Sequence, residues 1–237
     1  YYMTEIIRNI PIKNEDILEI LNKYIEISNI DGFEDTVHLQ CEDHNKEASQ
    51  RDKWVGDDYL KHLIQVEGDR HEGFPDHFLA RNFKPSDPKE MGNSFKSRSD
   101  YKTRKIITDS IYAVNEEIQL FLGTRNNALC AFYPPGGFIS WHNNWNAPGY
   151  NLIFSWSETG DGWFKYLDPK TKKIVTMQDE PGWQLKAGYF GHHGEPDKVC
   201  YHSASTDCNR ITVSFIFNHN DMSLNLQDEV IAEIAGE

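Results

Sequence analysis

Two histidines in the second half of the chain stand where metal ligands could converge. His142 ends one strand-like run, and His202 opens the segment before another. If these segments belong to one barrel, both imidazoles could point into its mouth. Asn144, two residues after His142, offers an amide oxygen beside them. Two imidazoles and one oxygen ligand form the facial set that suits non-haem Fe(II) and oxygen chemistry. Taken alone, His142 would be interpreted as a hydrogen-bonding side chain beside a turn.

An arginine opens the last strand-like run, eight residues after His202. Successive side chains of a strand point to opposite sides, so Arg210, Thr212 and Ser214 should share one face of this run. An arginine facing into a barrel can hold the far carboxylate of a dicarboxylate by a planar two-point ion pair, to which the Thr212 hydroxyl adds a hydrogen bond. Taken alone, Arg210 would be interpreted as half of a structural salt bridge.

The segments around these residues predict a β-rich second half. Short strand-like runs are separated by turns rich in Gly, Pro and Asp, a pattern typical of a sandwich or a jelly-roll barrel. The runs cover residues 128–133, 138–142, 151–156, 163–167, 173–177, 183–190 and 210–217.

Helical periodicity dominates elsewhere. Asn14 or Asp16 can cap a helix that runs to about Ser28, because apolar residues recur there at helical spacing. The remaining segments predict a polar loop at 42–53, a short helix or strand at 57–66, a helix at 103–122, and a short helix or frayed tail at 228–234.

The chain changes character near residue 105, which predicts two unequal parts. Residues 1–105 form a helical and loop region that packs on the core, and residues 106–237 form the core itself. The stretch 81–105 carries eight basic and three acidic residues. We expect it to be a solvated loop, with a site for an anionic substrate or nucleic acid as the alternative.

Composition excludes several classes of protein. The 237 residues include 38% hydrophobic and 13% aromatic residues, which is enough for a buried core and argues against global disorder. The net charge of −13 opposes binding of nucleic acid or anionic membrane by the whole surface. No phosphate-binding loop, nucleophile elbow or His-Glu-x-x-His motif occurs. Hydrolase and nucleotide-binding functions are therefore not indicated.

Localisation follows from what the chain lacks. The apolar stretches are far shorter than the roughly 20 residues that span a bilayer, and the first residues do not have the layout of a signal peptide. Four scattered cysteines fit a reducing compartment better than a disulfide framework. We expect a cytoplasmic protein without a membrane segment.

A set of motifs follows one order between Phe132 and Phe217. Gly136 and His142 stand three and nine residues after Tyr133, the turn 161–164 and the stretch 181–190 come next, and His202 and Arg210 complete the set. In this order and spacing the segment resembles the 2-oxoglutarate- and Fe(II)-dependent dioxygenases, most nearly their prolyl-hydroxylase-like branch. It is also similar to uncharacterised relatives carried by marine bacteriophages, which would place the protein in a host cytoplasm.

The resemblance implies a fold and an activity. The fold would be mainly β with flanking helices (α+β), a distorted double-stranded β-helix or jelly roll. The activity would be that of an oxidoreductase that uses Fe(II), 2-oxoglutarate and O2 to hydroxylate an unidentified peptidyl or small-molecule substrate, releasing succinate and CO2. His142, Asn144 and His202 would form the catalytic metal site, and Arg210, Thr212 and Tyr133 would bind the cosubstrate.

Asn144 departs from the pattern that the family shows. The family has Asp or Glu at this position, and a neutral amide oxygen is the weaker ligand for a hard cation, so metal affinity should fall unless neighbouring groups compensate. One alternative is therefore a catalytically silent jelly-roll binding module. A second is a halogenase-like variant, which is less favoured because Asn fills most of the volume that chloride would need.

Overall fold

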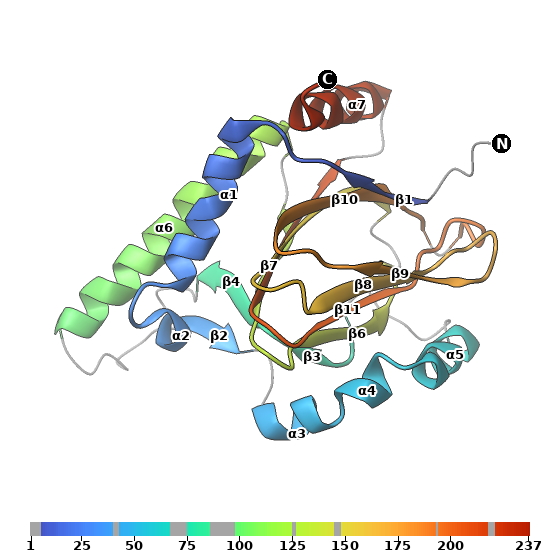
Figure 1. Ribbon diagram of the computed structural model, residues 1–237, viewed down its shortest axis with the longest axis horizontal. Coiled ribbons are helices and arrows are strands. Elements are labelled where there is room, and N and C mark those ends of the chain that lie inside the picture. Colours follow the sequence, from blue (N-terminus) through green and yellow to red (C-terminus); the bar gives the residue numbers. More distant parts are fainter. Residues whose placement is uncertain are drawn as a thin grey trace.

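The computed structural model describes residues 6–39, 43–66, 75–85, 98–124, 127–144, 148–192, 194–217 and 221–237. Within these ranges the chain forms two antiparallel β-sheets that pack face to face, with helices on their outer sides (Figure 1). Side chains of both sheets, among them Tyr133, Phe190, Ile139 and Phe164, share one hydrophobic core cluster between the sheets. The fold is thus mainly antiparallel β with some helices.

Strand order defines the two sheets. In hydrogen-bonded order, the larger sheet comprises β1 (Ile7–Ile10), β10 (Gly182–Phe190), β7 (Gly149–Ser157), β12 (Arg210–Phe217), β5 (Asn127–Tyr133), β4 (Arg81–Pro85) and β2 (Val37–Leu39). The smaller sheet comprises β3 (Phe78–Leu79), β6 (Phe138–His142), β11 (His202–Thr206), β8 (Gly162–Leu167) and β9 (Ile174–Gln178).

The chain crosses between the sheets repeatedly from β5 to β12. Strands β5, β7, β10 and β12 lie in the larger sheet, and β6, β8, β9 and β11 lie in the smaller one. Eight antiparallel strands shared between two sheets in this manner are compatible with the jelly roll that the sequence indicates. As a result, β12 pairs with β5 in the larger sheet, and β11 pairs with β6 in the smaller one.

Each face of β12 has the environment that its alternation predicts. Ile211, Val213 and Phe215 point outward into the core beneath the helices, where they are completely buried. Arg210 and Thr212 point inward, toward the smaller sheet, and line a cavity there. Burying a polar side chain costs free energy unless it is hydrogen-bonded, so this polar inner face needs polar partners.

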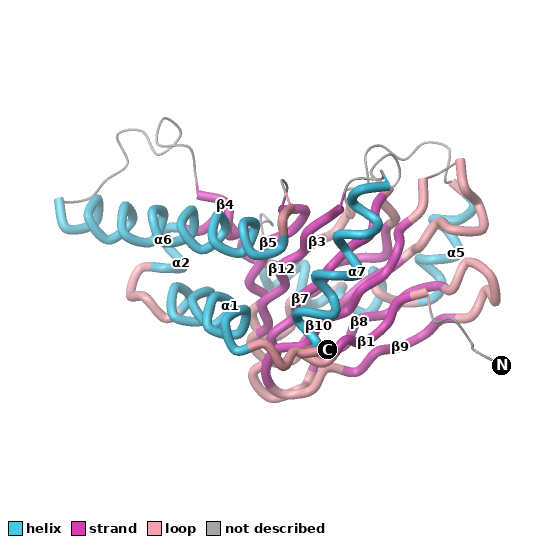
Figure 2. The backbone as a smooth tube through the Cα atoms, turned by 90° about the horizontal axis from the view of Figure 1, so that it is seen from above, coloured by secondary structure: helices cyan, strands magenta, loops and turns pink. Residues whose placement is uncertain are grey.

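Two long helices cover the outer face of the larger sheet (Figures 1 and 2). Helix α1 (Glu15–Ser28) begins at Asn14, whose side chain accepts a hydrogen bond of 3.2 Å from the Ile17 amide. Helix α6 (Arg98–Leu122) lies beside it and buries one apolar stripe. Short α2 (Phe33–Thr36) and C-terminal α7 (Asp221–Ala235) complete this layer.

A second helical layer packs on the smaller sheet. It consists of α3 (His44–Ser49), α4 (Arg51–Trp54) and α5 (Asp57–Gln65). Trp141 on β6 anchors it, because the indole Nε1 donates to the Val55 carbonyl at 2.9 Å and the ring packs against Leu60 and Leu63. This packing fixes the position of β6, the strand that ends at His142.

Several sequence predictions are corrected by these elements. The predicted polar loop at 42–53 is wrong for residues 44–49, which form α3, and for residues 51–53, which lie in α4. Asp43 explains the start of α3, because its carboxylate accepts from the Lys46 amide at 3.1 Å. The open choice at 57–66 resolves as a helix, and the tail helix is longer than predicted.

The first part of the chain contributes strands to both sheets. β1, β2 and β4 extend the larger sheet, β3 pairs with β6, and residue 105 lies inside α6. The division of the chain at residue 105 into two parts stays a prediction. The predicted solvated loop at 81–105 is wrong for residues 81–85 and 98–105, which lie in β4 and α6, while residues 86–97 lie outside the described residues.

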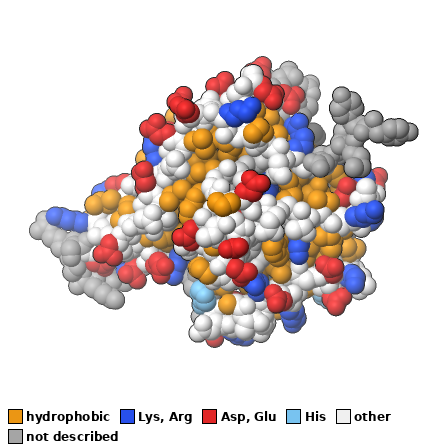
Figure 3. All heavy atoms as spheres, viewed as in Figure 1, with side chains coloured by type: hydrophobic (Ala, Val, Ile, Leu, Met, Phe, Trp, Pro, Cys, Tyr) orange, Lys and Arg blue, Asp and Glu red, His pale blue; other side chains and the backbone are white. Residues whose placement is uncertain are grey.

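Charge on the surface is mixed. On the face shown in Figure 3, acidic and basic side chains are interspersed with hydrophobic atoms. The basic residues of the stretch 81–105 that carry salt bridges include Arg81 with Glu34 and Lys105 with Asp109. Among the helices that the structure describes, none is long and apolar enough to cross a membrane.

Candidate functional site

All six residues that the sequence predicts for the site line one cavity between the sheets. Its volume is about 150 Å³. The six residues are Tyr133, His142, Asn144, His202, Arg210 and Thr212. They come from β5, the end of β6 and the segment after it, β11 and β12, which the crossing of the chain between the sheets places side by side. Apolar side chains such as Phe164 and Phe190 complete the wall.

The two histidines form an adjacent pair. His202 and His142 lie opposite each other in the β11–β6 ladder, and their ring centroids are 4.1 Å apart. Nδ1 of His142 lies 2.8 Å from the Ser140 carbonyl oxygen, and Nδ1 of His202 lies 3.0 Å from that of Cys200. A carbonyl oxygen only accepts, so each Nδ1 carries the proton and each Nε2 keeps a lone pair.

Burial keeps both imidazoles neutral. It lowers the pKa of His142 to about 4, and burial together with the neighbouring His142 lowers the pKa of His202 well below its usual value. A neutral imidazole whose Nδ1 is fixed by a backbone carbonyl is the form that binds a metal through Nε2. The pair is therefore suited to hold a cation rather than to transfer protons.

A tight turn sets the start of β6 and hence the position of His142. Gly136 has φ of +82°, a conformation that favours glycine, and the Gly137 amide donates to the Pro134 carbonyl at 2.8 Å. A Cβ at Gly137 would lie 2.7 Å from that same carbonyl oxygen, so only glycine fits there. The turn holds Tyr133 and β6 in a fixed relation at the same cavity.

An amide side chain lines the cavity beside the two histidines. Asn144 follows β6 and lines the cavity with both histidines. Within the described residues, no group of three or more His, Cys, Asp or Glu side chains lies where it could hold a metal ion. A metal at this site would therefore take two imidazole nitrogens and the Asn144 amide oxygen. These donors fit a first-row divalent cation. With an amide in place of a carboxylate, the ligand set carries one negative charge less.

One carboxylate that the sequence did not indicate acts on His142. The charge of Asp76 raises the pKa of His142, against the larger lowering by burial. Asp76 accepts a hydrogen bond of 2.7 Å from the Tyr59 hydroxyl. It lies near β6 because β3 pairs with β6, and that pairing joins segments far apart in the sequence. The sequence predicts no strand at 78–79, so nothing in the sequence indicates that Asp76 lies near His142.

Arg210 forms the salt bridge that its sequence suggested and lines the cavity as well. Its Nε donates to Asp179 Oδ2 at 2.7 Å, which makes a buried salt bridge. Its Nη2 donates to Ser155 Oγ at 3.2 Å, and its Nη1 donates to the Thr212 hydroxyl. An arginine has five N–H donors, and these three bonds leave one N–H on each Nη for a ligand in the cavity.

The carboxylate that holds Arg210 also holds a second buried cation. Lys186 on β10 is fully buried, and its Nζ lies 3.3 Å from Asp179 Oδ1 and 3.2 Å from Gln184 Oε1. Burial acts to raise the pKa of Asp179, but Arg210 and Lys186 outweigh it and hold that pKa below its usual value. Sequence reasoning missed both residues. The available signal was a lysine between Leu185 and Ala187 in a buried strand.

Tyr133 presents a buried polar atom toward the cavity. Its hydroxyl is inaccessible and has no hydrogen-bond partner among the residues that the structure describes. The guanidinium carbon of Arg210 lies 5.6 Å from the centre of its ring. Burial raises the pKa of Tyr133, so the hydroxyl is protonated and can donate. A ligand oxygen in the cavity would satisfy this hydroxyl.

Comparison with known proteins gives remote matches in structure alone. No protein-family model and no curated protein matches this chain. A prolyl-4-hydroxylase of Pseudomonas putida is similar over 82% of this chain and 98% of its own, at 12% identity and a TM-score of 0.30. A viral collagen prolyl hydroxylase of Paramecium bursaria Chlorella virus-1, solved with 2-oxoglutarate, covers 69% and 91% at 11% identity and a TM-score of 0.30.

A rice dioxygenase for auxin oxidation is also similar, over 73% of this chain and 68% of its own, at 14% identity and a TM-score of 0.29. All three solved structures are thus hydroxylases or dioxygenases by their descriptions. At these TM-scores the likeness carries no argument about the activity of this chain.

Proposed function

We propose that this chain is a non-haem Fe(II)- and 2-oxoglutarate-dependent dioxygenase, built on a distorted double-stranded β-helix formed by β5 to β12. It hydroxylates an unidentified peptidyl or small-molecule substrate and releases succinate and CO2. The observation that carries the proposal is the joint presence, in one cavity, of two neutral imidazoles with free Nε2 lone pairs and a buried guanidinium with unused N–H donors.

Each residue has a role in this proposal. His142, His202 and Asn144 hold Fe(II), which when bound supplies the redox chemistry with O2. Arg210 binds the far carboxylate of 2-oxoglutarate through the N–H groups that its protein partners leave unused. The Thr212 hydroxyl accepts from Arg210 and can donate its own proton to the same carboxylate. Tyr133 donates to an oxygen of the cosubstrate.

A second function is supported by Asn144 itself. A jelly-roll module that binds a small dicarboxylate without turnover would need Arg210 and Thr212 but not a strong metal site. The amide at position 144 fits that alternative. A halogenase-like variant has less support, because the Asn144 side chain occupies the position that chloride would need.

Succinate release tests the proposal. Purified protein supplied with Fe(II), 2-oxoglutarate, air and ascorbate, which supplies the two electrons that an absent substrate would give, is expected to release succinate. His202→Ala is expected to lose this activity because one of two imidazole ligands is gone. His192→Ala is the matched control, since His192 lies outside the cavity lining and should leave the rate unchanged. Equal succinate release by the wild type and His202→Ala would contradict the assignment. Absence of succinate with retained 2-oxoglutarate binding would favour the binding module.

Replacing Tyr133 with Phe should separate stability from binding. An unpaired buried hydroxyl costs about 1–3 kcal/mol, so the melting temperature of ligand-free protein should stay the same or rise. The lost hydrogen bond should weaken 2-oxoglutarate binding about 2- to 13-fold, because such a bond contributes about 0.5–1.5 kcal/mol. Calorimetric titration and thermal unfolding measure the two effects.

Tyr24→Phe is the control for this experiment. The Tyr24 hydroxyl donates to Asn115 Oδ1 at 2.6 Å, between α1 and α6 and away from the cavity. Its removal should lower stability and leave ligand affinity unchanged. If Tyr133→Phe behaves in the same way as Tyr24→Phe, Tyr133 does not contact the cosubstrate.

A further inference from the structure

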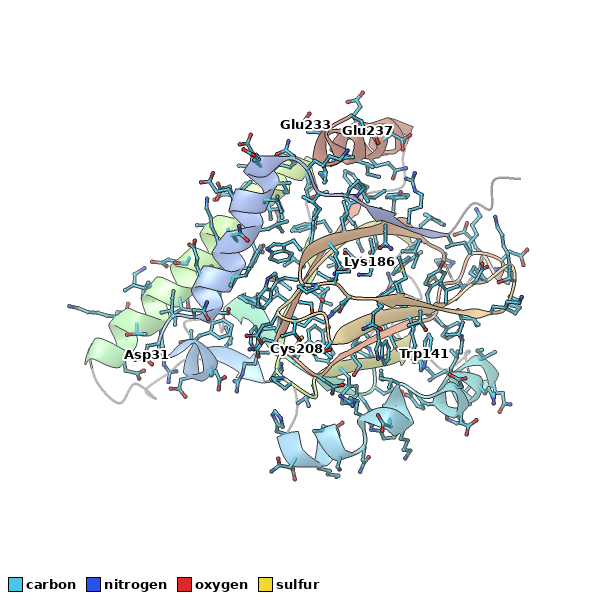
Figure 4. All side chains as sticks on the ribbon, in the orientation of Figure 1. Asp31, Trp141, Lys186, Cys208, Glu233 and Glu237 are labelled. Atoms are coloured by element: carbon cyan, nitrogen blue, oxygen red, sulfur yellow. The ribbon has the colours of Figure 1, made fainter. Side chains whose placement is uncertain are left out.

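We infer that Lys186, Asp179 and Arg210 act as one buried charge cluster whose excess positive charge selects ligands that carry a second carboxylate. This inference rests on the proposed function and assigns a part of it to two residues outside the cavity lining. Lys186 and Asp179 are positioning residues, because they act on the ligand through Arg210. Figure 4 shows Lys186 on β10, within the larger sheet.

The cluster is isolated from water. The side chains of Lys186 and Asp179 are 0% exposed, and that of Arg210 is 1% exposed. Two cations therefore share one carboxylate, and one positive charge is left over. A buried charge without a partner is costly, whereas a balanced set is tolerated. A ligand carboxylate beside Arg210 would balance the cluster.

Asp179 fixes the direction of the guanidinium. Its Oδ2 binds Nε of Arg210 at 2.7 Å, and its Oδ1 faces Lys186 Nζ at 3.3 Å. Because Asp179 binds the Nε side, both Nη atoms remain directed elsewhere, toward Ser155 and Thr212. Gly162 makes room for this arrangement, since a Cβ there would lie 2.7 Å from Asp179 Oδ2.

Lys186 keeps the cluster positive. If Arg210 and Asp179 were alone, they would form a neutral pair with little attraction for an anion. A fully buried lysine at the other carboxylate oxygen removes that neutrality. Burial is the largest influence on Lys186 and lowers its pKa, the charge of Arg210 lowers that pKa further, and Asp179 opposes both effects. No apolar packing role requires an ammonium group at this position, so the charge itself calls for an explanation.

Two other ionisable groups face Arg210. Tyr133 stays protonated, because burial raises its pKa. Cys208 lies in the turn between β11 and β12, and its thiol interacts with Arg210. Burial acts to raise the pKa of this thiol, but hydrogen bonds with Ser157, Thr159 and Thr206 lower it to about 7. Figure 4 labels Cys208. A thiolate at this position balances the cluster at higher pH, and a Cys208→Ser background removes this second anion.

The test compares two keto acids in this background. Protein loaded with Mn(II) is titrated anaerobically with 2-oxoglutarate and with 2-oxobutyrate, which lacks the second carboxylate. Lys186→Met, which makes the cluster neutral, should weaken 2-oxoglutarate binding about tenfold and change 2-oxobutyrate binding less than twofold. The double variant Asp179→Asn/Lys186→Met leaves Arg210 as the one charge, so the net charge is again positive. It should bind 2-oxoglutarate within about threefold of the parent.

The outcomes separate the inference from the proposed function. If the parent protein binds both keto acids equally, the cosubstrate assignment fails and the inference fails with it. If the parent prefers 2-oxoglutarate and Lys186→Met keeps that preference, the inference is wrong and the proposed function stands. A double variant that binds no better than Lys186→Met also overturns the charge argument. Should Lys186→Met not fold, Lys186→Gln removes the charge and keeps a donor to Asp179.

Discussion

Arg210→Ala is expected to abolish most of the affinity for 2-oxoglutarate. Truncating one partner of a buried, hydrogen-bonded charge pair costs about 2–5 kcal/mol, which corresponds to roughly 30-fold or more in the dissociation constant. The folded state should persist, because Asp179 keeps Lys186 as its partner when Arg210 is removed. Calorimetric titration of metal-loaded protein measures the loss, and thermal unfolding checks the fold.

Arg210→Lys is the matched variant. It keeps the charge but not the planar fork that reaches Asp179, Ser155 and Thr212 at once. We expect an affinity between those of the wild type and Arg210→Ala. Unchanged 2-oxoglutarate affinity in a folded Arg210→Ala protein would remove the cosubstrate assignment, and Arg210 would then be a structural salt bridge alone.

Asn144→Asp is expected to raise the affinity for Fe(II) about tenfold or more. The substitution places a carboxylate where the cavity offers a neutral amide, and hard divalent cations prefer charged oxygen ligands. Competition with a metal chelator under anaerobic conditions measures the change. Asn144→Ala, which removes the oxygen, should lower the affinity below that of the wild type.

Succinate formation by the same variants separates two explanations of Asn144. A large gain in Asn144→Asp would mean that the native site is impaired, which favours the binding module. Unchanged turnover with tighter metal binding would mean that the amide suits the native reaction. If none of the substitutions at position 144 changes metal affinity, this residue does not reach the metal.

The inner residues of the barrel could be predicted from sequence because they follow simple periodicity. The alternation of β12 separates Arg210 and Thr212 from Val213 and its apolar neighbours, and the structure places the two sets on opposite faces. His142 and His202 stand at the ends of segments, where a barrel brings strand ends together. Their adjacency in the β6–β11 ladder follows from that topology.

The partners of these residues could not be predicted, because they depend on pairings between distant segments. Asp179 follows β9 in a polar turn, and nothing in its local sequence indicates a buried position between two cations. Asp76 reaches His142 through the two-residue strand β3, which is too short to show alternation. β11 was also missed as a strand, since its five residues are all buried and small or polar, without a repeating pattern.

His142, His202 and Arg210 are proposed to form one site for a metal and a keto acid. An anaerobic titration of metal-stripped protein with Fe(II) and then 2-oxoglutarate tests it most directly. A keto acid that chelates protein-bound Fe(II) produces a visible charge-transfer absorption. We predict that this band appears, saturates with 2-oxoglutarate, and is absent from His202→Ala. A wild-type protein that binds neither Fe(II) nor 2-oxoglutarate would contradict the proposed dioxygenase.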